Sequence, residues 1–152
     1  MNLPTQYCTF YLAGQHFGVD VLEVQEILRF QEMTRVPLAS PAVSGLINLR
    51  GQIVTAIDLR RRVGLPDRDE GGRLPTNVVL HSDGGAVSFL VDEIGDVIEV
   101  EESAFEPPPD TMPGHLRELV TGVFKLEDHL LLVLDSAAAA DLDSRRPVEL
   151  GA

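Results

Sequence analysis

The stretch G-L-I-N-L-R-G-Q-I-V-T-A-I-D-L-R-R-R, from Gly45 to Arg62, sets the pattern for the rest of the chain. Two apolar, β-prone runs flank a short segment that contains Arg50 and Gly51. Such runs around a glycine-containing turn predict a β-hairpin, because glycine can take the positive φ angle that a tight turn needs. The hairpin would carry one cation, Arg50, at its tip. Asp58 ends the second run and is expected to cap a short helix over residues 59–63.

Short β-prone runs and turns continue along the whole chain. Further hairpins and single strands are predicted over residues 7–19, 24–30, 34–38, 77–91, 93–100 and 123–134. Residues 67–73 form a polar loop with two glycines, and residues 101–113 an acidic, proline-rich connector. This pattern predicts an all-β sandwich or a pair of small barrels.

A few helical turns complete the expected elements. Asp20 is a plausible cap for one turn, and the alanine-rich residues 137–142 favour a helix. Residues 115–120 fit either one helical turn or an extended entry into the next strand. Residues 144–152 are expected to be frayed.

The second half of the chain repeats the first. With a shift of 70 residues, Gly14 falls on Gly84 and the apolar pattern of residues 21–28 falls on that of residues 91–98. With a shift of 77 residues, the Gly45–Arg62 stretch meets the last hairpin, so that Asp58 falls on Asp135. The repeat suggests two similar β subdomains. At the hairpin tips, however, Glu127-Asp128 replaces Arg50-Gly51, so the two halves would present opposite charges.

Composition excludes several classes of protein. The net charge is −12, and the excess of acids lies in residues 83–152, which hold sixteen Asp and Glu against four Lys and Arg. An acidic surface repels phosphate backbones and anionic lipids, which argues against nucleic acid or a membrane surface as partner. The sequence has no apolar run long enough to span a bilayer and no visible signal peptide, so we expect a cytoplasmic protein.

Catalytic and metal-binding patterns are missing from the sequence. The single cysteine, Cys8, excludes an internal disulfide and a cysteine-based zinc site. The four histidines lack metal-ligand spacing, and three of them lie at turns or strand ends, where solvent exposure is the ordinary explanation. Adjacent carboxylates such as Glu101-Glu102 lie in the connector, with nothing apolar around them to raise a pKa. We therefore expect no enzyme activity, no cofactor and no metal.

Arg60-Arg61-Arg62 is the one basic run in the sequence. It is too short for a nucleic-acid patch and has no interleaved aromatic residues. On a helix that begins after Asp58, these arginines would lie in the last turn and interact favourably with the helix dipole. Contact with an acidic partner is the alternative.

Three stretches together resemble the CheW family of chemotaxis coupling proteins. They are V-D-V-L-E-V-Q-E-I-L, S-G-L-I-N-L-R-G-Q-I-V-T-A-I-D-L-R and F-L-V-D-E-I-G-D-V-I, and the similarity runs from about residue 6 to residue 142. One departure is Thr55-Ala56, where many relatives carry a proline after the I-V pair. Without proline this strand can donate one more ladder hydrogen bond, and we expect no change of fold.

The resemblance implies an all-β fold of two SH3-like five-stranded β-barrel subdomains packed together, with a few short helices. It implies a single CheW-like domain over residues 5–142, followed by a frayed C-terminal tail at residues 143–152. Subdomain one would lie mainly in residues 13–74 and subdomain two mainly in residues 75–142, with possible strand exchange at the ends.

The resemblance also implies partners. They are the regulatory domain of a CheA-type histidine kinase and the cytoplasmic hairpin tip of methyl-accepting chemoreceptors, coupled without catalysis at membrane-associated receptor arrays. The positions that match the family's contact sites are Val24, Glu26, Gly45, Arg50, Ser88, Ile94 and Val97. The two valines, Glu26 and Ile94 would line a groove between the subdomains, since an amphipathic helical hairpin needs an apolar strip with polar rims. Ordinary core packing is the alternative for the valines.

Other functions remain open at this point. The same type of adaptor could serve type IV pilus motility, biofilm formation or developmental signalling rather than flagellar taxis. A small β-barrel hydrolase would need a buried acid in a pocket, for which the sequence offers no candidate. An oligonucleotide-binding barrel is disfavoured by the net charge of −12 and by the lack of paired aromatic residues.

Overall fold

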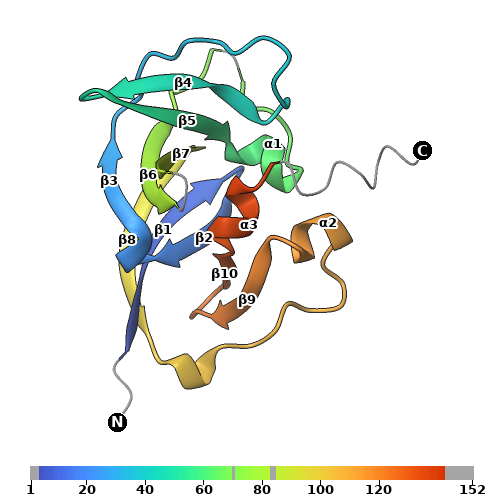
Figure 1. The fold of residues 1–152 in the computed structure, drawn as a ribbon. Helices are drawn as coiled ribbons and strands as arrows, with labels where there is room; N and C mark the ends of the chain where they lie inside the picture. The colour runs from blue at the N-terminus through green and yellow to red at the C-terminus, as the bar shows by residue number, and fades with distance from the viewer. Residues whose placement is uncertain (1–3, 70, 83–84, 143–152) are drawn as a thin grey trace.

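The computed structural model describes residues 4–69, 71–82 and 85–142, and the expected C-terminal tail lies outside them. The described chain forms two five-stranded sheets, one above the other in Figure 1. The strand order in one sheet is β8 (Glu93–Val100), β1 (Thr5–Leu12), β2 (Gln15–Asp20), β10 (Leu130–Leu134) and β9 (Val120–Lys125). In the other sheet it is β3 (Val24–Leu28), β6 (Thr76–Ser82), β7 (Gly85–Val91), β5 (Gln52–Asp58) and β4 (Val43–Leu49). The predicted all-β fold with two SH3-like subdomains is confirmed.

Short helices connect the strands. They are the 3-10 turns η1 (Val21–Glu23) and η2 (Glu102–Ala104) and the helices α1 (Leu59–Val63), α2 (Gly114–Arg117) and α3 (Ser136–Ala140). The side chain of Asp20 caps η1 and that of Asp135 caps α3, each by accepting a backbone N–H bond. The predicted cap at Asp58 is wrong, because its side chain makes no capping bond to α1. Asp58 instead lies 3.8 Å from Arg61 and 3.7 Å from Arg68.

The internal repeat appears as the same strand order in both sheets. Strands β1 to β5 correspond in sequence to β6 to β10, and each pair takes the same place in its sheet. The first hairpin of each repeat, however, pairs within the other repeat's sheet. In each sheet, the hairpins of the two repeats are joined by a parallel pair of strands, β2 with β10 in one sheet and β5 with β7 in the other. Each sheet therefore contains strands from both halves of the chain, and its two hairpins come from different repeats.

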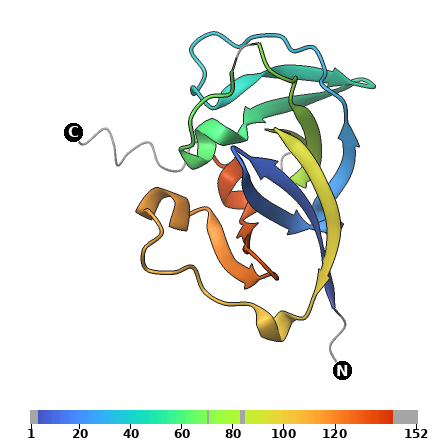
Figure 2. The same cartoon turned by 180° about the vertical axis from the view of Figure 1, so that it is seen from behind.

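This exchange changes the expected division of the chain. Residues 76–91 (β6 and β7) pair with β3 to β5, although the sequence assigned them to subdomain two. Residues 5–20 (β1 and β2) pair with β8 to β10, and Figure 2 shows β8 running beside β1 across the back of the molecule. Apolar alternation indicates where strands lie, but it does not encode which edges pair, so the sequence could not settle this point.

Connecting segments lie against the outer strands of both sheets. Thr34 forms a single antiparallel bridge with Leu46 on β4, and Glu106 forms the corresponding bridge with Val123 on β9. The strand predicted over residues 34–38 is thus wrong except for Thr34, because Pro37 and the loop that follows offer no further ladder. Residues 115–117 lie in helix α2, so the predicted helical turn is confirmed for this part of residues 115–120.

One apolar core joins the two sheets. It takes Phe10 and Phe17 from β1 and β2, and Phe89 from β7, all at most 1% exposed. Leu59 of α1 and Ala139 of α3 are also fully buried in it, and these two helices lie next to each other where the sheets meet (Figure 1). Burial of aliphatic and aromatic side chains stabilises such an interface by about 25 cal/mol per Å² of apolar surface.

Candidate partner-binding site

Two of the residues expected to bind a partner form an ion pair with each other. They are Glu26 on β3 and Arg50 at the tip of the β4–β5 hairpin. The tip is a two-residue turn in which Arg50 and Gly51 have positive φ angles of 53° and 89°. Tight hairpins of this kind use such turns because their twist matches that of the strands. The Asn48 side-chain oxygen accepts a hydrogen bond from Gly51 N at 2.9 Å, which supports the turn.

The ion pair joins the two outer strands of its sheet. Strand β3 lies at one end of the strand order and the β4–β5 hairpin at the other, so the contact between Glu26 and Arg50 helps to close the barrel. The Arg50 side chain nevertheless remains 67% exposed, whereas that of Glu26 is 24% exposed. Arg50 therefore has an internal contact and is also accessible to a partner.

β-Bulges lie beside two of the apolar residues expected to bind a partner, Val24 and Ile94. The register of β3 against β6 shifts between Val24 and Glu26, and that of β1 against β8 shifts next to Ile94. A β-bulge adds a residue to one strand and re-aims the side chains beside it. Val24 and Ile94 pack, half-buried, against the shared core, while Val97 is 56% exposed.

We give the name β3–β8 strip to four of the residues expected to bind a partner. It consists of Val24, Glu26, Ile94 and Val97, with Arg50 at its rim. Because β3 and β8 belong to different sheets, the strip receives side chains from both subdomains, which meet over one core. Ile27 on β3, which was not among the contact residues expected from the sequence, is 43% exposed. Its correspondence to Val97 in the repeat was the available signal.

Gly45 and Ser88, the remaining expected contact residues, are buried in their sheet. A Cβ atom on Gly45 would lie 2.7 Å from the Thr34 carbonyl oxygen, so the glycine accommodates the chain's own segment. The Ser88 hydroxyl donates to Asn77 Oδ1 at 3.1 Å, and both residues are fully buried. An effect of either residue on a partner would therefore be transmitted through the fold of this sheet.

His16 and His129 contact each other, which was not expected from the sequence. His16 on β2 is 6% exposed, which makes the expectation of solvent exposure wrong for this residue. Its ring stacks on Tyr11 at 4.6 Å, and its Nδ1 lies 2.9 Å from Nε2 of His129. Burial lowers the pKa of His16, the neighbouring His129 lowers it further, and Asp96 opposes the change. The two histidines are 113 residues apart, so no local sequence pattern could reveal their contact.

The three consecutive arginines have partners within the chain. Arg60 forms an ion pair with Asp92 at 2.5 Å, and Arg61 forms one with Asp67 at 2.9 Å. Arg62 donates to the carbonyl oxygens of Ala138 and Ala139, both at 2.8 Å, and so stabilises the end of α3. The predicted position of the three arginines in the last turn of α1 is thus confirmed.

Within the described ranges, no group of three or more His, Cys, Asp or Glu side chains is arranged to hold a metal ion. Nor does the described part of the chain include a helix that is long and apolar enough to cross a membrane.

Comparisons with known proteins agree on one family. The family model described as "CheW-like domain" matches residues 6–143. A chemotaxis protein CheW of Bacillus subtilis is 33% identical over 135 residues, covering 89% of this chain and 86% of that protein. Another, from Rhizobium meliloti, is 29% identical and covers 97% of this chain and 91% of its own. The crystal structure of the scaffolding protein TtCheW from Thermoanaerobacter tengcongensis superposes with a TM-score of 0.83 at 26% identity, over 93% of this chain and 95% of that one. The chain therefore belongs to the CheW-like family of chemotaxis scaffold proteins.

Proposed function

We propose that this protein is a non-catalytic adaptor that couples a CheA-type histidine kinase to methyl-accepting chemoreceptors. It would act in the cytoplasm and be recruited to membrane-associated receptor arrays. The observation that carries the proposal is the β3–β8 strip, which combines half-buried and exposed apolar side chains with a charged rim. A strip of this kind suits the apolar face of a helical hairpin.

The strip also offers a reason for coupling. Two related barrels with different surface charges can contact two different partners, and side chains from both barrels contribute to one strip. At the corresponding hairpin tips one barrel carries Arg50, while the other carries Asp128 beside His129.

Co-sedimentation tests the proposal. The full chain is mixed with a receptor cytoplasmic fragment and a kinase regulatory domain from the same bacterium, and the pelleted fractions are measured. We expect all three proteins to pellet together. Val97→Asp should reduce the pelleted fractions at least about tenfold, because it introduces a charge into the apolar strip.

Leu74→Asp is the matched control, since Leu74 is 67% exposed and lies outside the strip. Its assembly should equal that of the unmodified chain. Wild-type protein that fails to pellet with either partner would contradict the coupling role. A normal result with Val97→Asp would contradict the assignment of the strip.

The pathway served is a separate question. The same coupling role could operate in type IV pilus motility, biofilm formation or developmental signalling, and the identity of the kinase that the chain captures would distinguish these pathways.

A further inference from the structure

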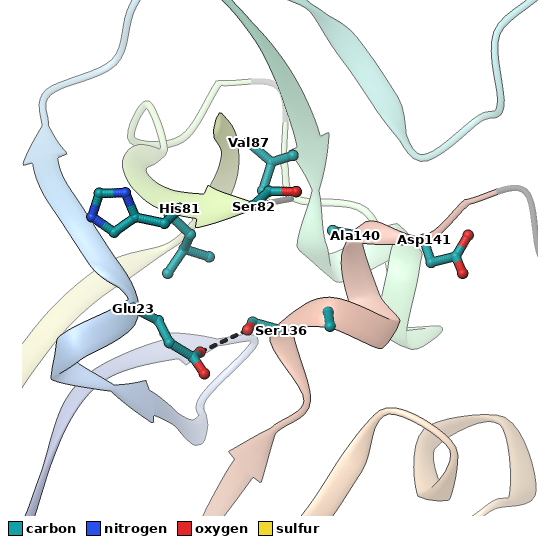
Figure 3. Close-up of a pocket in the computed structure, with 9 residues that line it drawn as sticks. Glu23, His81, Ser82, Val87, Ser136, Ala140 and Asp141 are labelled. Carbon is teal, nitrogen blue, oxygen red and sulfur yellow. Dashed lines mark hydrogen bonds between the residues drawn. The ribbon is translucent and has the colours of Figure 1, made fainter. Parts of the chain in front are cut away.

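A cleft of about 420 Å³ lies where η1, the end of the β6–β7 hairpin and α3 meet (Figure 3). The apolar part of its lining comes from Leu80, Val87, Ala137 and Ala140. The polar part consists of the carboxylates of Glu23 and Asp141, the hydroxyl groups of Ser82 and Ser136, and the imidazole of His81. We call this the α3 cleft.

Glu23 is held in a fixed position at the edge of the α3 cleft. The Ser136 hydroxyl donates a hydrogen bond to Glu23 Oε1 at 2.6 Å, which links η1 to α3 (Figure 3). The second carboxylate oxygen of Glu23 makes no hydrogen bond or ion pair to another described residue. One carboxylate oxygen is thus available to a ligand while the other is already oriented.

The internal repeat places a second cleft at the corresponding position beside α1. In the repeat, Glu23 corresponds to Glu93 and α3 corresponds to α1. This α1 cleft is lined by Arg60, Arg68, Asp69, Gly72, Arg73, Asp92 and Glu93. Two of its three acids are paired with arginines of the same chain, since Asp92 binds Arg60 and Arg68, and Glu93 lies 4.0 Å from Arg73.

The α3 cleft differs from its counterpart in its cations. Ala137 stands where the repeat has Arg60, and neither Lys nor Arg is among its lining residues in the described part of the chain. In the repeat, Arg60 corresponds to Ala137 and its acid Asp92 corresponds to Leu22, so the α3 cleft has neither member of that ion pair. It keeps Glu23 as the counterpart of Glu93.

We propose that the α3 cleft receives an arginine side chain presented by a partner protein. The guanidinium group would bind Glu23, because two planar N–H donors match a carboxylate well. The apolar walls suit the aliphatic stem of arginine. A net charge of −12 further favours a cationic ligand. The inference does not depend on which protein presents the arginine.

Amide chemical shifts of the ¹⁵N-labelled full chain provide the test. The probe is Nα-acetyl-arginine methylamide, and the control ligand is the citrulline derivative, which has nearly the same shape without the charge. We expect saturable shifts at Ser136 and Ala137 with the arginine derivative only. Glu23→Gln should weaken binding about fivefold, the scale of one partly exposed ion pair. Glu93→Gln, the corresponding change in the α1 cleft, should leave binding unchanged.

A second variant blocks the cleft. Ala137→Arg introduces the residue that α1 has at this position, so its side chain should fill part of the cleft and abolish binding, while the unfolding midpoint stays near that of the unmodified chain. Equal binding of the citrulline derivative, or normal binding by Ala137→Arg, would overturn the proposal.

Two other occupants would also overturn it. The sequence after Leu142 contains Arg145 and Arg146. If replacing both with alanine strengthens binding of the probe about tenfold or more, the chain's own arginines occupy the cleft. If the Ser136 and Ala137 amides shift when the chain alone is concentrated, a second copy occupies it. No kinase or receptor enters these titrations, so their result is independent of the coupling role.

Discussion

Arg50 at the tip of the β4–β5 hairpin forms an ion pair with Glu26 on β3, and thereby connects the two outer strands of one sheet. The turn that presents Arg50 is fixed by two positive φ angles, and the guanidinium is still mostly exposed. The pair can therefore act in two ways. Arg50 can contact a partner directly, or it can hold the β3–β8 strip in shape.

In the charge-reversed variant Arg50→Glu, the fraction of protein that pellets with kinase and receptor is expected to fall about tenfold or more. Its free energy of unfolding should change by about 1 kcal/mol or less, because an exposed ion pair contributes little to stability. Co-sedimentation and urea unfolding measure the two quantities. Arg73→Glu is the control, since Arg73 is 81% exposed and only loosely paired.

The double variant Glu26→Arg with Arg50→Glu separates the two roles of Arg50. If the ion pair only shapes the strip, the exchanged charges should restore assembly to near the original level. If Arg50 contacts a partner, the double variant should remain as defective as Arg50→Glu. Normal assembly by the single variant would remove Arg50 from the site altogether.

Gly45→Ala is expected to destabilise the protein by about 2–3 kcal/mol, the cost of forcing a methyl group into a packed interior. The added Cβ would lie 2.7 Å from the Thr34 carbonyl oxygen and 2.9 Å from Met33 Cβ. Gly71→Ala is the control, because a Cβ there meets nothing within 4 Å. Urea unfolding compares the two variants, and equal stability would contradict the close approach of residues 33–34 to β4.

The ion pair between Arg60 and Asp92 should contribute more to stability than the one between Arg61 and Asp67. Burial tends to raise the pKa of Asp92, but hydrogen bonds from Arg60, the Ala13 amide and Arg68 lower it below the usual range. Asp92→Ala would leave Arg60 without its acid and remove one of the two acids near Arg68, and it is expected to cost about 2–3 kcal/mol.

Asp67→Ala serves as the comparison for that variant, because its ion pair lies at the surface. Urea unfolding of Asp67→Ala should differ little from that of the unmodified chain. Equal losses for the two variants would show that burial of the Asp92 network is not what stabilises it.

The stability of the protein should fall as the pH drops below about 6.5, the ordinary pKa of histidine. The pKa of His16 is lowered by burial and by His129, so the unfolded chain binds a proton more readily than the folded one. The contribution of His16 is thus complete above the pKa of the unfolded chain, and it is lost as the pH falls toward the lower pKa of the folded state. An NMR titration of the His16 ring with a midpoint at or above 6.5 would contradict this.

His129→Gln provides the matched variant for the pH dependence. It removes the second imidazole from His16 but leaves the stacking of His16 on Tyr11 in place. The pKa of His16 should rise, and unfolding should become less sensitive to pH in the acidic range. An unchanged pKa would mean that burial alone accounts for the shift.

Much of the fold could be predicted because its determinants are local. The alternating runs and turn glycines of the Gly45–Arg62 stretch recur at shifts of 70 and 77 residues, and this repeat identifies two similar subdomains. The exchange of hairpins between sheets could be expected only as a possibility at the ends of the subdomains, and the strands involved could not be identified. It depends on the parallel junctions of β2 with β10 and of β5 with β7, which join segments distant in the sequence.

The site was predictable only in part, for a similar reason. The family resemblance indicated Glu26 and Arg50, and the structure brings them together. It also indicated Gly45 and Ser88, but both residues are buried in the structure. The motif pointed to them because it does not distinguish a residue that contacts a partner from one that shapes the fold. The cap expected at Asp58 fails because its carboxylate faces arginines instead of the start of α1.

The most direct test of the central claim, coupling of a kinase to receptors, is kinase autophosphorylation in vesicles that carry the receptor. The rate is measured with and without the full chain, in the presence and absence of the receptor's ligand. The proposal predicts that the chain changes the rate at least about tenfold, and that the receptor's ligand alters it only when the chain is present. A rate that responds equally to the ligand with and without the chain would contradict the adaptor role.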